Sequence, residues 1–396
     1  MNTTVVKYFL FVLSPFLAVP IVLHDIYKRK DDNYVLISLL FGLLSYAYIP
    51  LYTNDKAYYY ELYEYFSLIN FDQFVYFLTD KPDFIFYLLV FLFAKLAVSV
   101  QFLFLAITTF TVWVWFKTFN EIQRLFKFNS KEYLIFFLLV LFSFSIDHLL
   151  SGTRNYFAFS FVALGFLNGL IRKSKLKGLL FLILGVCIHF SSLIFLPFYF
   201  LLVSSPNKHN AYRTIFLFSF AFILVPREFI FQLTENIGLP AALKFKLESY
   251  LGDSDFIENS IKTGNINNYI QIVFNGLWSY FAYAYLIFTI KRKSILRNLT
   301  LVVFAVANIF YSAPDTYFRY LLIAQLIFIV LLVYEYGTEK KSLSFHKVLL
   351  AVFIINFFGN IYAVRDQILK SYINLYSSTS VTYFMKEQIT YKDFIE

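Results

Sequence analysis

Three basic side chains adjoin long apolar segments of this sequence, where charge is rare. Arg154 lies in SGTRNYFAFSF, His189 in CIHFSSLIF and Arg319 in DTYFRYLLIAQ. A charged side chain in or near a bilayer costs about 2.5–3.5 kcal/mol on insertion scales, so it indicates a functional site. Guanidinium groups form paired hydrogen bonds with phosphate oxygens. Two arginines and a histidine on one face of a membrane protein therefore resemble a clamp for a diphosphate.

Each of these residues also has a purely structural interpretation. Asp147, shortly before Arg154, is a candidate ion-pair partner for that arginine. Asp315 lies four residues before Arg319, which puts both on one helical face. His189 could simply cap the end of a helix. These alternatives stay open at the level of sequence.

Further candidates precede or accompany these residues. Asp55 opens the tyrosine-rich stretch DKAYYYELYEYF, in which Tyr59 and its neighbours suit either stacking on sugar rings or an aromatic belt at the membrane surface. Asp55 itself is either a functional carboxylate or a solvated loop residue. His148, next to Asp147, is a weaker candidate for a functional role than His189.

Composition places the chain among polytopic membrane proteins. Its 396 residues are 59% hydrophobic and 15% charged, with a mean hydropathy of +0.65, against roughly 25% charged residues in soluble domains. The net charge of +9 comes largely from short loops between apolar spans, so no nucleic-acid partner is expected. No spacing typical of metal ligands occurs, and we predict no essential metal and no cofactor.

The apolar segments predict an all-α protein with about twelve transmembrane helices. They lie near 8–23, 34–50, 99–116, 133–150, 154–171, 176–188, 190–203, 212–226, 270–290, 298–312, 319–336 and 347–363. Placing Lys28, Arg29 and Lys30 in the cytoplasm puts the basic loops near 117–131, 172–177, 208–213, 291–297 and 340–347 on the same side. The first span is interpreted as a retained helix with its N-terminus outside.

That orientation leaves residues 83–98 as an interfacial or re-entrant helix, because a crossing there would invert a basic loop. Segments 51–82 and 227–269 then cap the outer face, over an expected outer-face cavity. The short spans on either side of His189 predict a broken hairpin that lines this cavity. We expect one transmembrane domain over 1–364, followed by an outer-face tail over 365–396.

The order of these motifs resembles the EpsG/Wzy-type polysaccharide polymerases over about residues 35–340. The resemblance rests on Asp55 with its tyrosines, Arg154-Asn155 opening an apolar helix, the Ile188–Ser192 motif with Pro197, and Arg319-Tyr320 opening a late span. Glutamine often follows the first arginine in such proteins, whereas Asn155 stands here. Both residues are polar amides.

The resemblance implies a membrane glycosyltransferase at the outer face of the bacterial cytoplasmic membrane. It would transfer a growing glycan from undecaprenyl diphosphate to a hydroxyl of the next lipid-linked repeat unit. Arg154 and Arg319 would bind the diphosphate, and His189, or else Asp55, would act as general base. The remaining candidates would bind sugar or orient these groups: Asp147, His148, Asn155, Tyr59, Asp315 and Tyr320.

Two other functions fit parts of the pattern. A flippase for the same lipid-linked sugars would also use intramembrane charges and broken helices, although it would need polar groups exposed to each side in turn. Another lipid-linked-glycan transferase, similar to O-antigen ligases, would share the outer cavity. The resemblance implies donor and acceptor lipids as substrates, and a chain-length regulator and a flippase as functional partners.

Overall fold

The computed structural model describes residues 3–28, 34–52, 54–79, 81–226, 266–339 and 342–371, together with 229, 232, 379, 380, 384 and 389–394. Every regular element among these residues is a helix, which confirms the predicted all-α class. Most of the predicted outer segment 227–269 and much of the tail over 365–396 lie outside the described residues.

The N-terminal segment forms two helices, α1 (Thr3–Leu13) and α2 (Pro15–Tyr27), instead of the single predicted helix over 8–23. Lys7 Nζ lies 3.3 Å from Asp25 Oδ2, and both side chains are buried. Eighteen residues of one straight helix would separate them by about 27 Å, so the chain bends back. Pro15 explains the break after the extended Ser14, because proline favours the first position of a new helix.

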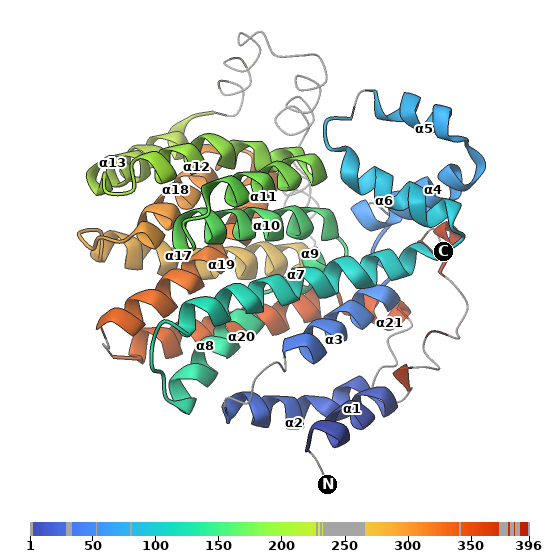
Figure 1. Cartoon of the computed structure of the whole chain (residues 1–396), viewed down its shortest axis with the longest axis horizontal. Helices are drawn as coiled ribbons and strands as arrows, with labels where there is room; N and C mark the ends of the chain where they lie inside the picture. Colours follow the sequence, from blue (N-terminus) through green and yellow to red (C-terminus); the bar gives the residue numbers. More distant parts are fainter. Residues whose placement is uncertain are drawn as a thin grey trace.

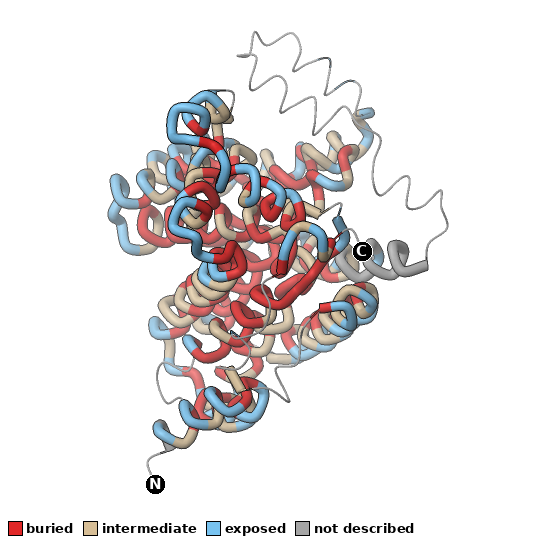
Figure 2. The backbone as a smooth tube through the Cα atoms, turned by 90° about the vertical axis from the view of Figure 1, so that its right-hand side faces the viewer, coloured by how far each residue is buried: buried red, intermediate tan, exposed pale blue. Residues whose placement is uncertain are grey.

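Long helices run side by side through the rest of the molecule (Figure 1). They are α3 (Tyr34–Ala47), α7 (Val100–Gln123), α8 (Ser130–Phe142), α10 (Thr153–Phe166), α11 (Lys175–Ile188), α12 (Phe195–Ser204), α13 (His209–Ser219), α17 (Ile266–Phe288), α18 (Ile295–Ile309), α19 (Pro314–Glu339) and α20 (Ser344–Ala363). The pairs with the most extensive contact are α3 with α7, α10 with α11, and α18 with α19. The buried residues lie where the helices face one another, and the exposed ones lie toward the outside of the bundle (Figure 2).

Three of the described helices, α7, α19 and α20, are long and apolar enough to cross a membrane. Many large apolar side chains are exposed on the outside of the bundle, among them Leu176 on α11, Phe218 on α13 and Phe358 on α20. Such a surface is expected where lipid replaces water as the neighbour. The structure supports a membrane protein, and the number of about twelve crossings stays a prediction.

The predicted hairpin around His189 is broken as expected. Helix α11 ends at Ile188, His189 is extended, and a short 3-10 helix η2 (Phe190–Ile194) precedes α12. The hydroxyl of Tyr199 on α12 donates to the Lys175 carbonyl at the start of α11 at 2.5 Å, so the two helices run antiparallel. The neighbouring predicted spans are also divided: 133–150 into α8 and α9 (Ile146–Leu150), and 154–171 into α10 and a π-helical turn η1 (Leu167–Ile171). Predicted span 212–226 becomes α13 and a 3-10 turn η3 (Phe220–Leu224).

Helices α4 (Asp55–Leu68), α5 (Phe71–Leu78) and α6 (Phe84–Lys95) form a group at one end of α7 (Figure 1). Lys95 Nζ donates to the Ser67 carbonyl at 3.0 Å and so ties the end of α6 to the end of α4. Twelve residues of helix span about 18 Å, less than the ~30 Å of a bilayer core. The length of α6 therefore agrees with an interfacial or re-entrant helix.

The C-terminal part of the chain returns to this group. After α21 (Arg365–Lys370), a 3-10 turn η4 (Tyr391–Phe394) packs against α4. The Phe394 ring lies 4.7 Å from that of Tyr60, and the amide of Ile389 donates to Gln101 Oε1 at 3.1 Å. These contacts put the described part of the tail at the same end of the bundle as α4 to α6.

Close packing of α10 on α11 depends on glycine, and we predict that Gly165→Ala destabilises the fold. An added Cβ would lie 2.7 Å from Leu182 Cγ and 3.0 Å from the Gly178 carbonyl oxygen, so the helices would have to separate. The expected loss is about 1–3 kcal/mol, as for other overpacked cores. Thermal denaturation in detergent measures it.

Gly276→Ala is the matched control, because its nearest new contact, with Phe318, would be an ordinary 3.8 Å. Alanine favours a helix over glycine by about 0.5–1 kcal/mol, so this variant should be at least as stable as the unmodified protein. Equal melting temperatures for the two variants would show that close approach at Gly165 does not matter.

Candidate functional site

A buried carboxylate, Asp83, joins two of the residues singled out from the sequence. It directly precedes α6 and is fully buried, and its Oδ2 lies 3.4 Å from Arg154 Nη1 and 3.4 Å from His189 Nδ1. The amide of Phe190 also points to Oδ2, at 3.5 Å. One carboxylate thus connects the starts of α6 and α10 with the break in the hairpin.

Sequence analysis did not identify Asp83 as a site residue. The structural alternative for Arg154, an ion pair with Asp147, is not seen among the described residues, where Arg154 pairs with Asp83, 71 positions earlier in the chain. Asp147 instead accepts hydrogen bonds from the hydroxyls of Tyr48, at 3.3 Å, and Ser151, at 3.2 Å. One available signal was the sequence TDKPDFIFYLL, where an aspartate stands directly before an apolar run, as at many helix starts.

Aromatic residues of the α4–α6 group fix the orientation of Arg154. Its Nη1 donates to the Tyr87 hydroxyl at 3.4 Å, and its guanidinium carbon lies 5.8 Å from the centre of the Tyr59 ring. Burial raises the pKa of Tyr87 to about 12 although the Arg154 charge lowers it, so this phenol stays neutral. Tyr59 is only 1% exposed, which favours the orienting role over stacking on a sugar.

Asp55 is the first residue of α4 and is partly exposed. Its neighbour Lys56 is fully buried, and the Lys56 ammonium donates to the carbonyls of Ser45, at 2.5 Å, and Tyr48, at 2.7 Å. These bonds fasten the start of α4 to the end of α3. The Asp55 charge acts on Arg154 from this fixed position.

The start of α19 approaches the same group of residues. Tyr320 donates its hydroxyl to the Ser191 carbonyl in η2 at 2.9 Å. The charge of Arg319 acts electrostatically on both His148 and His189, while Asp315 in the first turn is exposed. Arg154 and Arg319, which lie far apart in the sequence, therefore both act electrostatically on His189.

Several buried polar atoms at this end of the bundle lack a hydrogen-bond partner among the described residues. They are Arg154 Nε, Thr153 Oγ1, Asn155 Oδ1, Ser191 Oγ, Ser192 Oγ and Thr316 Oγ1, from α10, η2 and α19. Leaving a buried polar group unsatisfied costs about 1–3 kcal/mol. Other such atoms occur elsewhere in the molecule, and the six named here belong to residues on or near the three basic ones, where they would suit a polar ligand.

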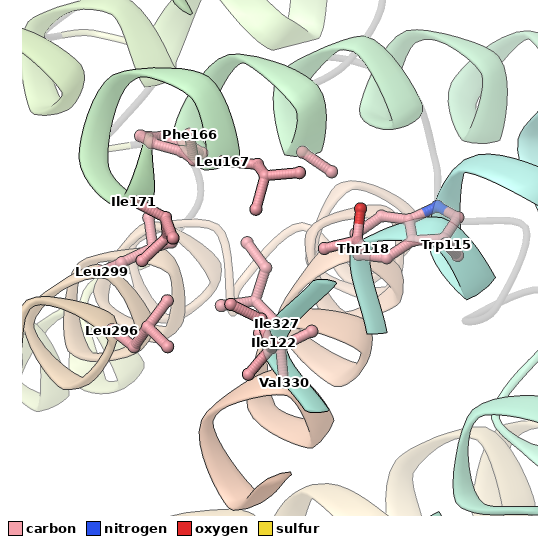
Figure 3. A pocket seen from close by; sticks show the side chains of 11 residues that line it. Trp115, Thr118, Ile122, Phe166, Leu167, Ile171, Leu296, Leu299, Ile327 and Val330 are labelled. Carbon is pink, nitrogen blue, oxygen red and sulfur yellow. The ribbon is translucent and has the colours of Figure 1, made fainter. Parts of the chain in front are cut away.

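A pocket with an empty volume of about 360 Å³ lies elsewhere, between α7, α10, α18 and α19 (Figure 3). Its walls are almost entirely apolar and include Phe166 and Val330. Phe166 follows Arg154 by twelve residues, about 18 Å along the helix. This pocket is therefore not the polar outer-face cavity expected from the sequence, which stays a prediction.

The fold and this cluster define an all-helical membrane protein with arginines at the starts of two helices and a buried carboxylate beside one of them. The family model named EpsG matches residues 51–378. The chain belongs to the EpsG family, the family of Wzy-type polysaccharide polymerase-like proteins. No curated protein matches the chain, and no solved structure does.

We predict that Asp83→Asn destabilises the protein strongly, because the buried Arg154 charge would lose its counter-charge. Removing one partner of a buried ion pair costs about 3–5 kcal/mol. Melting temperatures of Asp83→Asn, Arg154→Ala and the double variant form a cycle that measures the coupling.

Asp366→Asn provides the control, because its carboxylate is 66% exposed and lies 3.9 Å from Arg365. An exposed pair of this kind contributes about 0–1 kcal/mol. Strictly additive losses in the Asp83 and Arg154 variants would contradict a direct ion pair.

Proposed function

We propose that this chain is a polysaccharide polymerase, an integral membrane glycosyltransferase of the bacterial cytoplasmic membrane. It transfers a growing glycan from undecaprenyl diphosphate to the next lipid-linked repeat unit at the outer face. Family membership supports the general class. The observation that supports the specific reaction is that two arginines at the starts of different helices, Arg154 and Arg319, both act electrostatically on His189.

The departing group in this reaction is a diphosphate. As the bond between the anomeric carbon and the phosphate oxygen breaks, negative charge develops on that oxygen. Cations held in place before the reaction stabilise such charge most effectively. Arg154 meets this requirement, because Asp83, Tyr87 and Tyr59 hold its side chain before any substrate arrives.

Asp83 and His189 serve Arg154 in this proposal. Two arginines that bind one diphosphate repel each other, and the buried Asp83 carboxylate offsets part of that repulsion. His189 is 1% exposed and lies against the same carboxylate oxygen. Its burial favours a positioning role over the direct proton transfer predicted from the sequence.

A lipid-linked substrate also explains where the cluster lies. The isoprenoid tail of the substrate stays among the membrane lipids, while its diphosphate and sugars remain at the surface. Helix starts at one end of the bundle are suited to that boundary. A flippase that delivers repeat units and a chain-length regulator are the functional partners that this role requires.

The glycan made in cells tests the proposal. In a strain that depends on this chain, Arg154→Ala and Arg319→Ala should reduce polymer to single repeat units on undecaprenyl diphosphate, accessible from the outside. Removing one such donor typically costs about 10²–10³ in rate. Gel analysis of labelled glycan, at matched membrane levels, measures the effect.

Arg172→Ala is the control, since Arg172 follows η1, lies exposed at the far end of α10 and pairs with Glu121. It should leave polymer length unchanged. Single units that accumulate on the cytoplasmic side would favour a flippase instead. Polymer of normal length in both site variants would reject the clamp.

A further inference from the structure

A second histidine lies next to the cluster with a different environment from that of His189. His148 belongs to α9, the five-residue helix directly before α10, and its side chain is only partly buried. Gly152 makes the connection tight, because a Cβ there would lie 3.2 Å from the His148 carbonyl oxygen. His148 and Arg154 are therefore held on either side of one short turn.

The two nitrogens of the His148 ring are not equivalent. Nδ1 lies 3.0 Å from Ser145 Oγ, whereas Nε2 has no hydrogen-bond partner among the described residues. When Nδ1 carries the proton and donates it to Ser145, Nε2 keeps a lone pair and can accept a proton. The amide of Ser145 donates to the Tyr156 hydroxyl on α10 at 3.2 Å, which ties this end of α9 to the helix that bears Arg154.

Charges from several elements act on the His148 ring. They come from Asp147 beside it, Arg319 and Asp315 at the start of α19, and Asp55 at the start of α4. Burial disfavours an imidazolium ion at this position, and the three carboxylates among these four groups offset part of that cost as the ion forms. His148 is therefore within electrostatic reach of the starts of α19 and α4, and it is partly exposed whereas His189 is buried.

We propose that His148 is the general base of the transfer reaction. The acceptor hydroxyl gives its proton to Nε2 as its oxygen bonds to the anomeric carbon of the donor. The bond from that carbon to the diphosphate breaks, and its electron pair leaves on the phosphate oxygen that Arg154 and Arg319 bind. His148 then returns the proton to water. This role rests on the proposed function and assigns it a specific catalytic group.

Transfer in proteoliposomes tests the assignment. The probe is the single lipid-linked repeat unit extracted from cells that lack this chain, which serves as donor and acceptor. His148→Gln should lower kcat by about 10²–10⁴, the usual contribution of a general base, with KM within a few-fold. His148→Ala should recover part of its activity when imidazole is added, and Ser145→Ala should lose activity less severely because the ring stays present.

Asp55→Asn and His189→Gln distinguish the competing assignments. A kcat within threefold of the unmodified protein for His148→Gln would overturn the proposal. A second combination of results would also overturn it: imidazole does not restore His148→Ala, the melting temperature of that variant is unchanged, and Asp55→Asn abolishes transfer. If Arg154→Ala loses transfer while His148→Gln stays active, the role proposed for His148 is rejected and the proposed function remains. An unmodified protein that fails to extend the extracted unit would remove the proposed function itself.

Discussion

A carboxylate buried without water must be paired, and this requirement at Asp83 determines how one end of the molecule is built. Its oxygen approaches both Arg154 and His189, and an isolated charge at that depth would be highly unfavourable. The starts of α6 and α10 and the break between α11 and η2 therefore have to meet at one point. Tyr59 of α4 and Tyr87 of α6 then contact the Arg154 guanidinium and help to hold its side chain.

At the opposite end of the bundle, arginines are paired with glutamates. There Arg297 is fully buried and binds Glu335 through Nε at 2.8 Å, while Arg292 Nη1 binds the same carboxylate at 2.6 Å. Glu339 adds a second carboxylate, 2.9 Å from Arg292. This network contains two arginines and two glutamates, and it joins the start of α18 to the end of α19.

Sequence patterns identified features that depend on local chemistry. The short apolar run before His189 predicted the hairpin break that the structure shows. That residues 83–98 do not cross the membrane stays a prediction. The prediction failed at the helix over 8–23, where Pro15 and the pairing of Lys7 with Asp25 reverse the chain. The sequence offered Asp147 as one possible partner of Arg154 because it is nearby in the chain, whereas tertiary packing supplies Asp83. Roles of individual histidines depend on burial, which hydropathy does not reveal.

Under the proposed function, the chemistry of a lipid-linked substrate explains the location of the cluster. A diphosphate linked to a long isoprenoid cannot move far from the membrane surface, so its binding groups must stand where helices end. Helices α10 and α19 begin beside the cluster, and their unpaired backbone amides add partial positive charge to that of Arg154 and Arg319. Such helix starts bind anions without metal-ligand chemistry. The glycan itself needs hydroxyl and amide partners, which Thr153, Asn155 and Ser192 offer beside the arginines.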